Sequence, residues 1–147
     1  GGNELVPNAT MVVQKREWQA AQDPETAAKV GFFRADFDHG HKIMQVDGEH
    51  DLFGDGSVVC VPTYGHTPGH QSLKVRTEAG DIVITGDACY FCRTLRERRL
   101  PRFVWDREQM LASLDRLEAL EKGGARLFFG HDPDFWKDVP QAPVPAF

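Results

Sequence analysis

Short runs of apolar and β-branched residues, separated by turn residues, predict strands through the middle of the chain. Residues 9–14 and 57–62 are nearly continuous apolar runs typical of buried strands, and residues 42–46 form a third candidate. Residues 71–77 alternate apolar and polar side chains, as a strand with one solvated face does, and a glycine turn then leads into residues 81–85. These last two runs are expected to form a hairpin.

Helical periodicity is strongest late in the chain. Apolar residues recur every three or four positions over residues 106–122, Asp106 can cap the first turn, and a glycine pair ends the run. Residues 15–30 also read as helix, which Pro24 is expected to divide because proline interrupts a helix. The pattern therefore predicts one long helix late in the chain and a broken one near its start.

The remaining segments have no clear period. Residues 31–40 are expected to be irregular, residues 89–104 to form a loop over a site, and residues after Pro140 to run extended over the surface. Residues 126–129 read as a short strand after the long helix. The order strand, strand, hairpin, loop, helix, strand predicts an α/β fold in which a mixed sheet, rather than a regular βαβ sheet, packs on helices.

Composition narrows the classes of function. The 147 residues, 41% of them hydrophobic, make one domain at most, or part of a larger one. A net charge of −5 argues against nucleic acid as a partner. No apolar run approaches the roughly 20 residues of a membrane span, and no signal peptide is visible. We therefore expect a cytoplasmic protein that binds neither nucleic acid nor membrane.

A local basic cluster and a pair of cysteines are minor candidate sites. Three cysteines are an odd number for a disulfide framework, so Cys89 and Cys92 are expected to be reduced thiols rather than a redox module. The basic cluster is interpreted as a solvated face, with binding of an anionic substrate group as the alternative. It consists of Arg93, Arg96, Arg98, Arg99 and Arg102.

Three polar turns carry the main candidate chemistry. His70, Asp87 and His131 each follow an apolar strand, so the strands would fix their positions while the turns leave the side chains facing a cleft. Imidazole nitrogen and carboxylate oxygen suit zinc, and also manganese, iron or cobalt. A structural hydrogen-bonding role and metal-free acid–base chemistry remain alternatives. His66, in the same turn as His70, either shapes the loop or adds a second ligand.

The motifs in these turns resemble those of a known family. His66-Thr-Pro-Gly-His70, Gly86-Asp87 and Gly130-His131-Asp132 are similar to the later metal-binding motifs of the metallo-β-lactamase superfamily. The run from Asp87 to Tyr90 and the run Asp51-Leu-Phe-Gly-Asp-Gly-Ser57 resemble its N-acyl-homoserine lactonase-like members. The resemblance implies a four-layer αββα fold and a metal-dependent, quorum-quenching hydrolase that opens lactone rings with hydroxide.

The resemblance also implies a metal site. It assigns His70 to one zinc ion, His131 to the other and Asp87 as the carboxylate bridging both. The family's first metal motif, His-x-His-x-Asp-His, does not occur in this sequence. We therefore expect residues 1–147 to be the C-terminal part of such a domain, completed by an N-terminal segment or by another chain, for example in a homodimer.

Roles toward the substrate follow from the same resemblance. Tyr90 is expected to hydrogen-bond the substrate carbonyl or the leaving oxygen, and Asp132 to orient a histidine or relay a proton. Phe32 and Phe33 are expected to contact an acyl chain. Packing roles for Tyr90 and the phenylalanines, and a turn role for Asp132, are the alternatives. A thioester or phosphoester hydrolase, or an inactive fragment acting as a scaffold, remain alternative functions.

Overall fold

The computed structural model describes residues 2–141 and residue 144, so most of the tail predicted to run extended lies outside the described residues. The strands are β1 (Thr10–Gln14), β2 (Lys42–Val46), β3 (His50–Asp51), β4 (Val58–Pro62), β5 (Gln71–Thr77), β6 (Gly80–Ile84) and β7 (Arg126–Phe128). The helices are α1 (Lys15–Gln22), α2 (Pro24–Val30), α3 (Arg34–Phe37), α4 (Cys92–Glu97), α5 (Arg107–Lys122) and α6 (Pro133–Lys137), with 3-10 turns η1 (Asn3–Leu5) and η2 (Gly86–Ala88).

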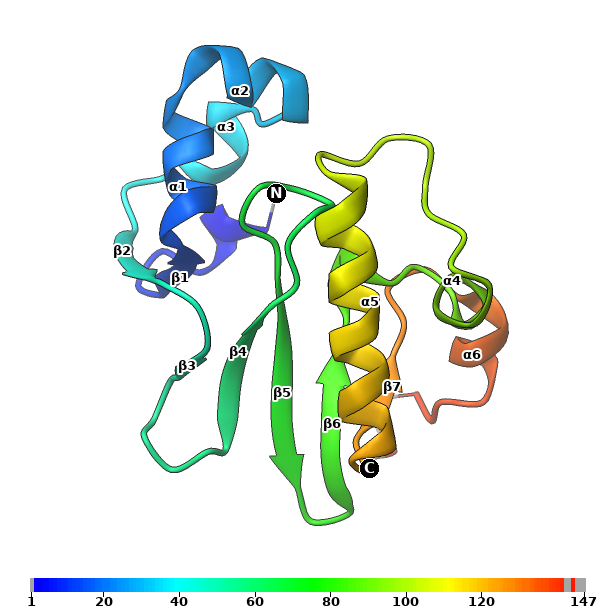
Figure 1. Ribbon diagram of the computed structural model, residues 1–147. Helices are drawn as coiled ribbons and strands as arrows, with labels where there is room; N and C mark the ends of the chain where they lie inside the picture. The colour runs from blue at the N-terminus through cyan, green and yellow to red at the C-terminus, as the bar shows by residue number, and fades with distance from the viewer. Residues whose placement is uncertain (1, 142–143, 145–147) are drawn as a thin grey trace.

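The strands form two sheets of unequal size. The larger has five strands in the order β3-β4-β5-β6-β7, of which β3 to β6 pair antiparallel and β7 joins parallel to β6. The smaller is the parallel pair β1-β2. α5 lies across one face of the larger sheet, while α1 to α3 gather beside its β4 and β5 end (Figure 1). The mixed sheet packed on helices confirms the predicted α/β class.

α5 forms the main core with the sheet. Leu114 and Leu117 are fully buried against Val83 and Leu127, which neighbour each other across β6 and β7. The Asp106 carboxylate accepts from the Gln109 backbone N–H at 3.0 Å, so the predicted cap is present. The predicted helix over residues 106–122 is confirmed apart from this capping residue.

The N-terminal helices follow the predicted break at proline. α1 ends before Asp23, whose carboxylate accepts from Thr26 N and caps α2, and Pro24 takes the first helical position. α2 ends at Gly31, which adopts the left-handed conformation at φ 86°.

Three short helices lie where no helix was predicted. Residues 31–40 contain α3, residues 89–104 contain α4, and α6 follows the turn at Asp132. Each is six residues or shorter, so none shows a recognisable period, and side-chain contacts hold them instead. The Trp18 and Phe37 rings, for example, pack edge to face at 5.8 Å between α1 and α3. The prediction that residues 89–104 form only a loop was therefore wrong.

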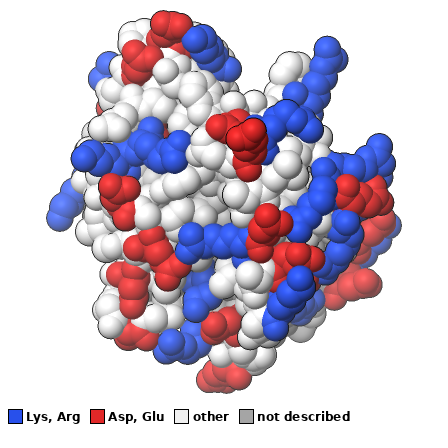
Figure 2. All heavy atoms as spheres, viewed as in Figure 1, with Lys and Arg blue, Asp and Glu red and all other residues white. Residues whose placement is uncertain are grey.

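The basic cluster is largely paired. Arg96 makes two hydrogen bonds of 2.6 Å to Glu121, and Arg98 contacts Glu118 at 3.0 Å, which docks α4 against α5. Basic and acidic side chains alternate on this side of the molecule (Figure 2). The pairing favours the interpretation of the basic cluster as a solvated face.

None of the helices in the described part of the chain has the length and hydropathy that a membrane span requires.

Candidate metal centre

The sheet topology brings three turns to one edge. β4 and β6 both pair antiparallel with β5, so they run in the same direction, and β7 runs parallel to β6. The turns that follow these three strands therefore emerge at the same edge of the sheet. They carry His66 and His70, then Asp87, then His131.

Asp87 lies between two imidazoles. Its Oδ1 is 2.9 Å from His131 Nε2, and its Oδ2 is 3.3 Å from His66 Nε2. The hydrogen bond from His66, followed by that from His131, outweighs partial burial and lowers the pKa of the Asp87 carboxyl to about 2. Asp87 is therefore a carboxylate at any pH near neutrality.

His70 contacts the backbone of Asp87 rather than its carboxylate. Its Nδ1 lies 2.9 Å from Thr63 Oγ1 and 3.1 Å from the Thr63 carbonyl oxygen, and its Nε2 accepts from the Asp87 backbone N–H at 3.1 Å. Burial, reinforced by the nearby His66, lowers the pKa of His70 to about 4, so its ring is neutral. Both ring nitrogens are thus engaged within the protein, and His70 supports the backbone that carries Asp87.

The structure therefore rearranges the predicted trio of His70, Asp87 and His131. Asp87 and His131 are in contact, but the second imidazole at the carboxylate belongs to His66 rather than to His70. The sequence pattern left open whether His66 shapes the loop or adds a second ligand, because one turn carries both histidines.

The turns of Asp87 and His131 also pack backbone against backbone. Gly130 N donates to the Cys89 carbonyl at 3.2 Å, and His131 N donates to the Tyr90 carbonyl at 2.9 Å. A Cβ placed on Gly130 would lie 2.6 Å from the Gly86 carbonyl oxygen, so only glycine permits this approach.

The donor set suits a divalent metal in its chemistry. Two imidazole Nε2 atoms and one carboxylate are borderline ligands of the kind zinc prefers. Among the described residues, His66 Nδ1 is buried and has no hydrogen-bond partner. As arranged, the described residues hold no group of three or more His, Cys, Asp or Glu side chains in metal-binding geometry. The imidazoles instead contact the carboxylate directly.

Tyr90 and Asp132 have different surroundings. The Tyr90 ring lies 4.6 Å from the His131 ring and 5.7 Å from the His66 ring, centroid to centroid. Burial, with the Asp87 charge, raises the pKa of the Tyr90 phenol, so its hydroxyl keeps its proton near neutral pH. Asp132 contacts no imidazole: its carboxylate accepts from Cys92 N at 2.8 Å and caps α6.

Two cavities lie near the N-terminal helices. Phe32 and Phe33 line one of about 270 Å³, which includes none of the histidines or Asp87. A second cavity, of about 410 Å³, borders His66 itself. Its other walls are Lys29, Val30, Thr67, Arg102, Phe103, Val104 and Trp105. No pattern in the sequence predicts this cavity, because the segment that includes Arg102 to Trp105 has no period.

Residues 1–131 match the profile of the Metallo-beta-lactamase superfamily, Lactamase_B. The chain therefore belongs to this superfamily.

Among the curated relatives of the chain are proteins named N-acyl homoserine lactonase. The chain is 39% identical over 144 residues to N-acyl homoserine lactonase AttM of Azorhizobium caulinodans, covering 93% of this chain and 55% of that protein. It is 34% identical over 135 residues to N-acyl homoserine lactonase AiiA of Bacillus thuringiensis subsp. kurstaki, covering 90% and 50%. The chain thus spans about half the length of the curated relatives it matches.

A solved structure shows the same relation in three dimensions. An N-acyl homoserine lactone hydrolase with the product N-hexanoyl-L-homoserine bound at its catalytic metal centre superposes with a TM-score of 0.83 at 30% sequence identity. The match covers 98% of this chain and 55% of that one. The described elements therefore occur together, in the same arrangement, within that enzyme.

Proposed function

We propose that these 147 residues carry part of the catalytic centre of a metal-dependent hydrolase that opens the lactone ring of N-acyl homoserine lactones. The observation that carries this proposal is the Asp87 carboxylate between His66 and His131, with Tyr90 beside both rings. The names of the relatives and the product bound in the superposed structure support the substrate class.

His66, Asp87 and His131 are the residues proposed to hold metal, as two zinc ions in the complete site. The two histidines would hold the metal through imidazole nitrogen, and Asp87 would hold it through carboxylate oxygen. This assigns to His66 the role that the sequence predicted for His70, because both nitrogens of His70 are already hydrogen-bonded within the protein. Bound divalent metal lowers the pKa of water and polarises a carbonyl, which is the chemistry that lactone hydrolysis needs.

The other site residues act on the substrate or on the turns. Tyr90 is proposed to donate its hydroxyl hydrogen to the lactone carbonyl or to the leaving oxygen, since its raised pKa keeps the proton on the phenol. Asp132 is proposed to hold the turn that carries His131 through its bond to Cys92 N, rather than to relay a proton.

The acyl chain is proposed to lie in the cavity beside His66, against Phe103 and Trp105. The cavity of Phe32 and Phe33 is separate from the site residues, so these rings would meet only a longer chain.

The remaining ligands would come from outside this sequence. Catalytic zinc usually has three protein ligands and an open position, and no His-x-His-x-Asp-His motif occurs among the 147 residues. A further segment or a different chain would supply them. A cytoplasmic location is part of the same proposal, and the three cysteines, all free, suit a reducing compartment.

A phosphoester substrate is the second candidate. Lys29 and Arg102 give the cavity beside His66 two cationic walls, which would favour an anionic group. Lys29 is paired with Glu25, which offsets one of the two charges, and Arg102 lies over the Phe103 ring. This pairing is why the neutral lactone ranks first.

The test compares His66→Ala, His70→Ala and His131→Ala with His39→Ala, a histidine outside the site. Each change is made in the complete protein, with the segment or chain that supplies the remaining ligands present. N-acyl homoserine lactones and aryl phosphoesters are then offered to each variant, and zinc per chain is measured by elemental analysis. We expect lactone opening and zinc to fall together in His66→Ala and His131→Ala and to persist in His39→Ala. Unchanged lactone opening in His131→Ala would falsify the proposal, and a preference for phosphoesters would replace the substrate.

A further inference from the structure

Helix α1 is hydrogen-bonded to the turn that carries His66. Glu17, in the first turn of α1, accepts from the Thr67 hydroxyl through Oε1 and from the Gly69 backbone N–H through Oε2, both at 2.5 Å. The two donors lie on either side of Pro68, fifty or more positions along the chain from Glu17. One carboxylate therefore fixes both the side chain and the backbone of the turn.

The turn and the helix fit closely at Gly69. A Cβ added to Gly69 would lie 2.4 Å from the Glu17 backbone nitrogen and 2.8 Å from its Cα. The turn thus lies directly against the helix backbone, at a distance that only glycine allows.

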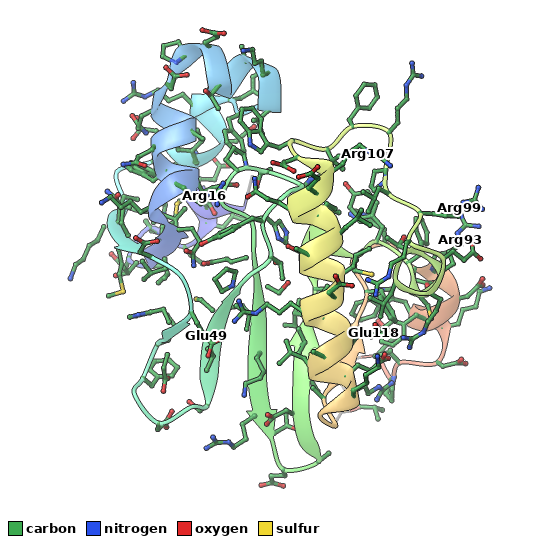
Figure 3. All side chains as sticks on the ribbon, viewed as in Figure 1. Arg16, Glu49, Arg93, Arg99, Arg107 and Glu118 are labelled. Atoms are coloured by element: carbon green, nitrogen blue, oxygen red, sulfur yellow. The ribbon has the colours of Figure 1, made fainter. Side chains whose placement is uncertain are left out.

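Neighbouring residues hold α1 in place around this contact. Gln14, which is 1% exposed, donates to the Gly48 carbonyl at 2.9 Å and accepts from the Tyr64 hydroxyl at 3.1 Å. Arg16 lies between α1 and the start of α5 (Figure 3), where it donates to Gln109 Oε1 at 2.9 Å. α1 is therefore also held by contacts other than those of Glu17 to the turn.

His66 depends on this support more than His70 does. The His66 ring makes one contact to Asp87, at 3.3 Å, and its Nδ1 has no partner. His70 is held at both nitrogens by Thr63 and Asp87. Burial raises the pKa of Glu17, opposed by its bonds to Thr67 and Gly69 and by the nearby His66 and Arg16. An ionised Glu17 accepts both donors at once, which neither an amide nor a protonated acid can do equally well.

We propose that Glu17 is a positioning residue that sets the orientation of His66 toward Asp87, and thereby toward a bound metal, by clamping Thr67 and Gly69. The inference deepens the proposed function and rests on it for the role of His66 as a ligand.

Two variants test the clamp, and one matches it as a control. Glu17→Gln keeps the shape of the side chain but presents an NH₂ group to one of the two donors. Thr67→Val keeps Glu17 and removes the hydroxyl. Glu25→Gln makes the same change of charge on the neighbouring helix α2, at an exposed residue that pairs only with Lys29.

The first measurement is ring ¹H–¹⁵N NMR of the histidines in the metal-free protein. We expect the His66 signals to shift or broaden in Glu17→Gln and in Thr67→Val, and to stay in place in Glu25→Gln. His70 is the internal control, because Thr63 and Asp87 hold it independently of Glu17.

The second measurement is titration of each protein with Co²⁺, followed by its visible absorption. Changes in the residues that orient metal ligands typically weaken binding by about 10-fold to 100-fold, and we expect at least about 10-fold in Glu17→Gln. A purely structural role would lower the midpoint of unfolding without altering Co²⁺ affinity below that midpoint.

The inference is overturned if His66 signals and Co²⁺ affinity in both variants match those of Glu25→Gln. If Glu17→Gln fails to fold, Thr67→Val alone decides by the same criterion. Absence of Co²⁺ binding by the unaltered protein, with the segment or chain that supplies the remaining ligands present, would instead reject the proposed function, and the His66 signals would still decide whether Glu17 positions the ring.

Discussion

Substituting Gly130 by alanine tests how closely the turns of Asp87 and His131 are packed. The added Cβ would lie 2.6 Å from the Gly86 carbonyl oxygen and 3.2 Å from its carbon. Real Cβ atoms essentially never come within 3.0 Å of such atoms, so the turns must separate by at least about 0.4 Å, the difference between these distances. Gly130 does not have a positive φ, so alanine meets no backbone penalty there.

The expected cost follows from two opposing effects. Overpacking against backbone costs about 1–3 kcal/mol, and the lower entropy of the unfolded alanine chain returns about 0.4–1 kcal/mol. The net destabilisation is therefore about 1–2 kcal/mol. Because the displaced turn carries His131, the 2.9 Å contact to Asp87 should lengthen as well.

Equilibrium urea unfolding measures this loss, and ring NMR of His131 reports the contact. Gly2→Ala is the matched control, since Gly2 has φ −95° and no atom within 4 Å of its added Cβ. An unfolding midpoint for Gly130→Ala at or above that of Gly2→Ala would refute the reasoning, because the gap would then accommodate a methyl group.

Three further predictions concern the core, the capping aspartate and the tyrosine. Leu114→Ala, which empties a fully buried site under α5, should cost about 3 kcal/mol in urea unfolding, against no more than about 0.5 kcal/mol for the exposed Leu111→Ala. Asp132→Ala should lower the free energy of unfolding by about 1–2 kcal/mol. The bond from Cys92 N, above all, lowers the pKa of the Asp132 carboxyl in the folded state. The stability difference between the two proteins should therefore be complete above the unfolded pKa of about 3.9 and should vanish as the pH falls through the folded pKa. A stability difference that persists at lower pH would contradict this assignment. Tyr90→Phe should keep its unfolding midpoint but lower kcat for lactone opening by about 10-fold or more, and an unchanged kcat would make Tyr90 a packing residue only.

Local patterns predicted most of the fold because local interactions determine those elements. The hairpin of β5 and β6 follows from alternation and a glycine turn, and α5 follows from its periodicity and the cap at Asp106. The short helices were missed because distant partners stabilise them: α4 is held to α5 through Arg96 and Glu121. No window of sequence around α4 contains that information.

Part of the candidate site was likewise predictable from the sequence. Asp87 and His131 meet because β6 and β7 run parallel, and strand order made this foreseeable. The choice between His66 and His70 depends on the conformation of one turn, which spacing does not determine. The contacts of Glu17 to this turn join residues fifty positions apart, so only the folded structure brings them together.

The two imidazoles at Asp87 are consequently held by different parts of the molecule. His131 is fixed from within the sheet edge, since its turn bonds to the backbone of Cys89 and Tyr90. The turn of His66 is held by elements outside the sheet. Glu17 of α1 accepts a hydrogen bond from it, and Trp105 N donates to the His66 carbonyl at 3.1 Å. Changes in α1 or in the segment before α5 should therefore move His66 and leave His131 in place. Because the cavity of about 410 Å³ beside His66 is lined by Trp105 and its neighbours, a group bound there contacts the same segment that orients one of the two imidazoles.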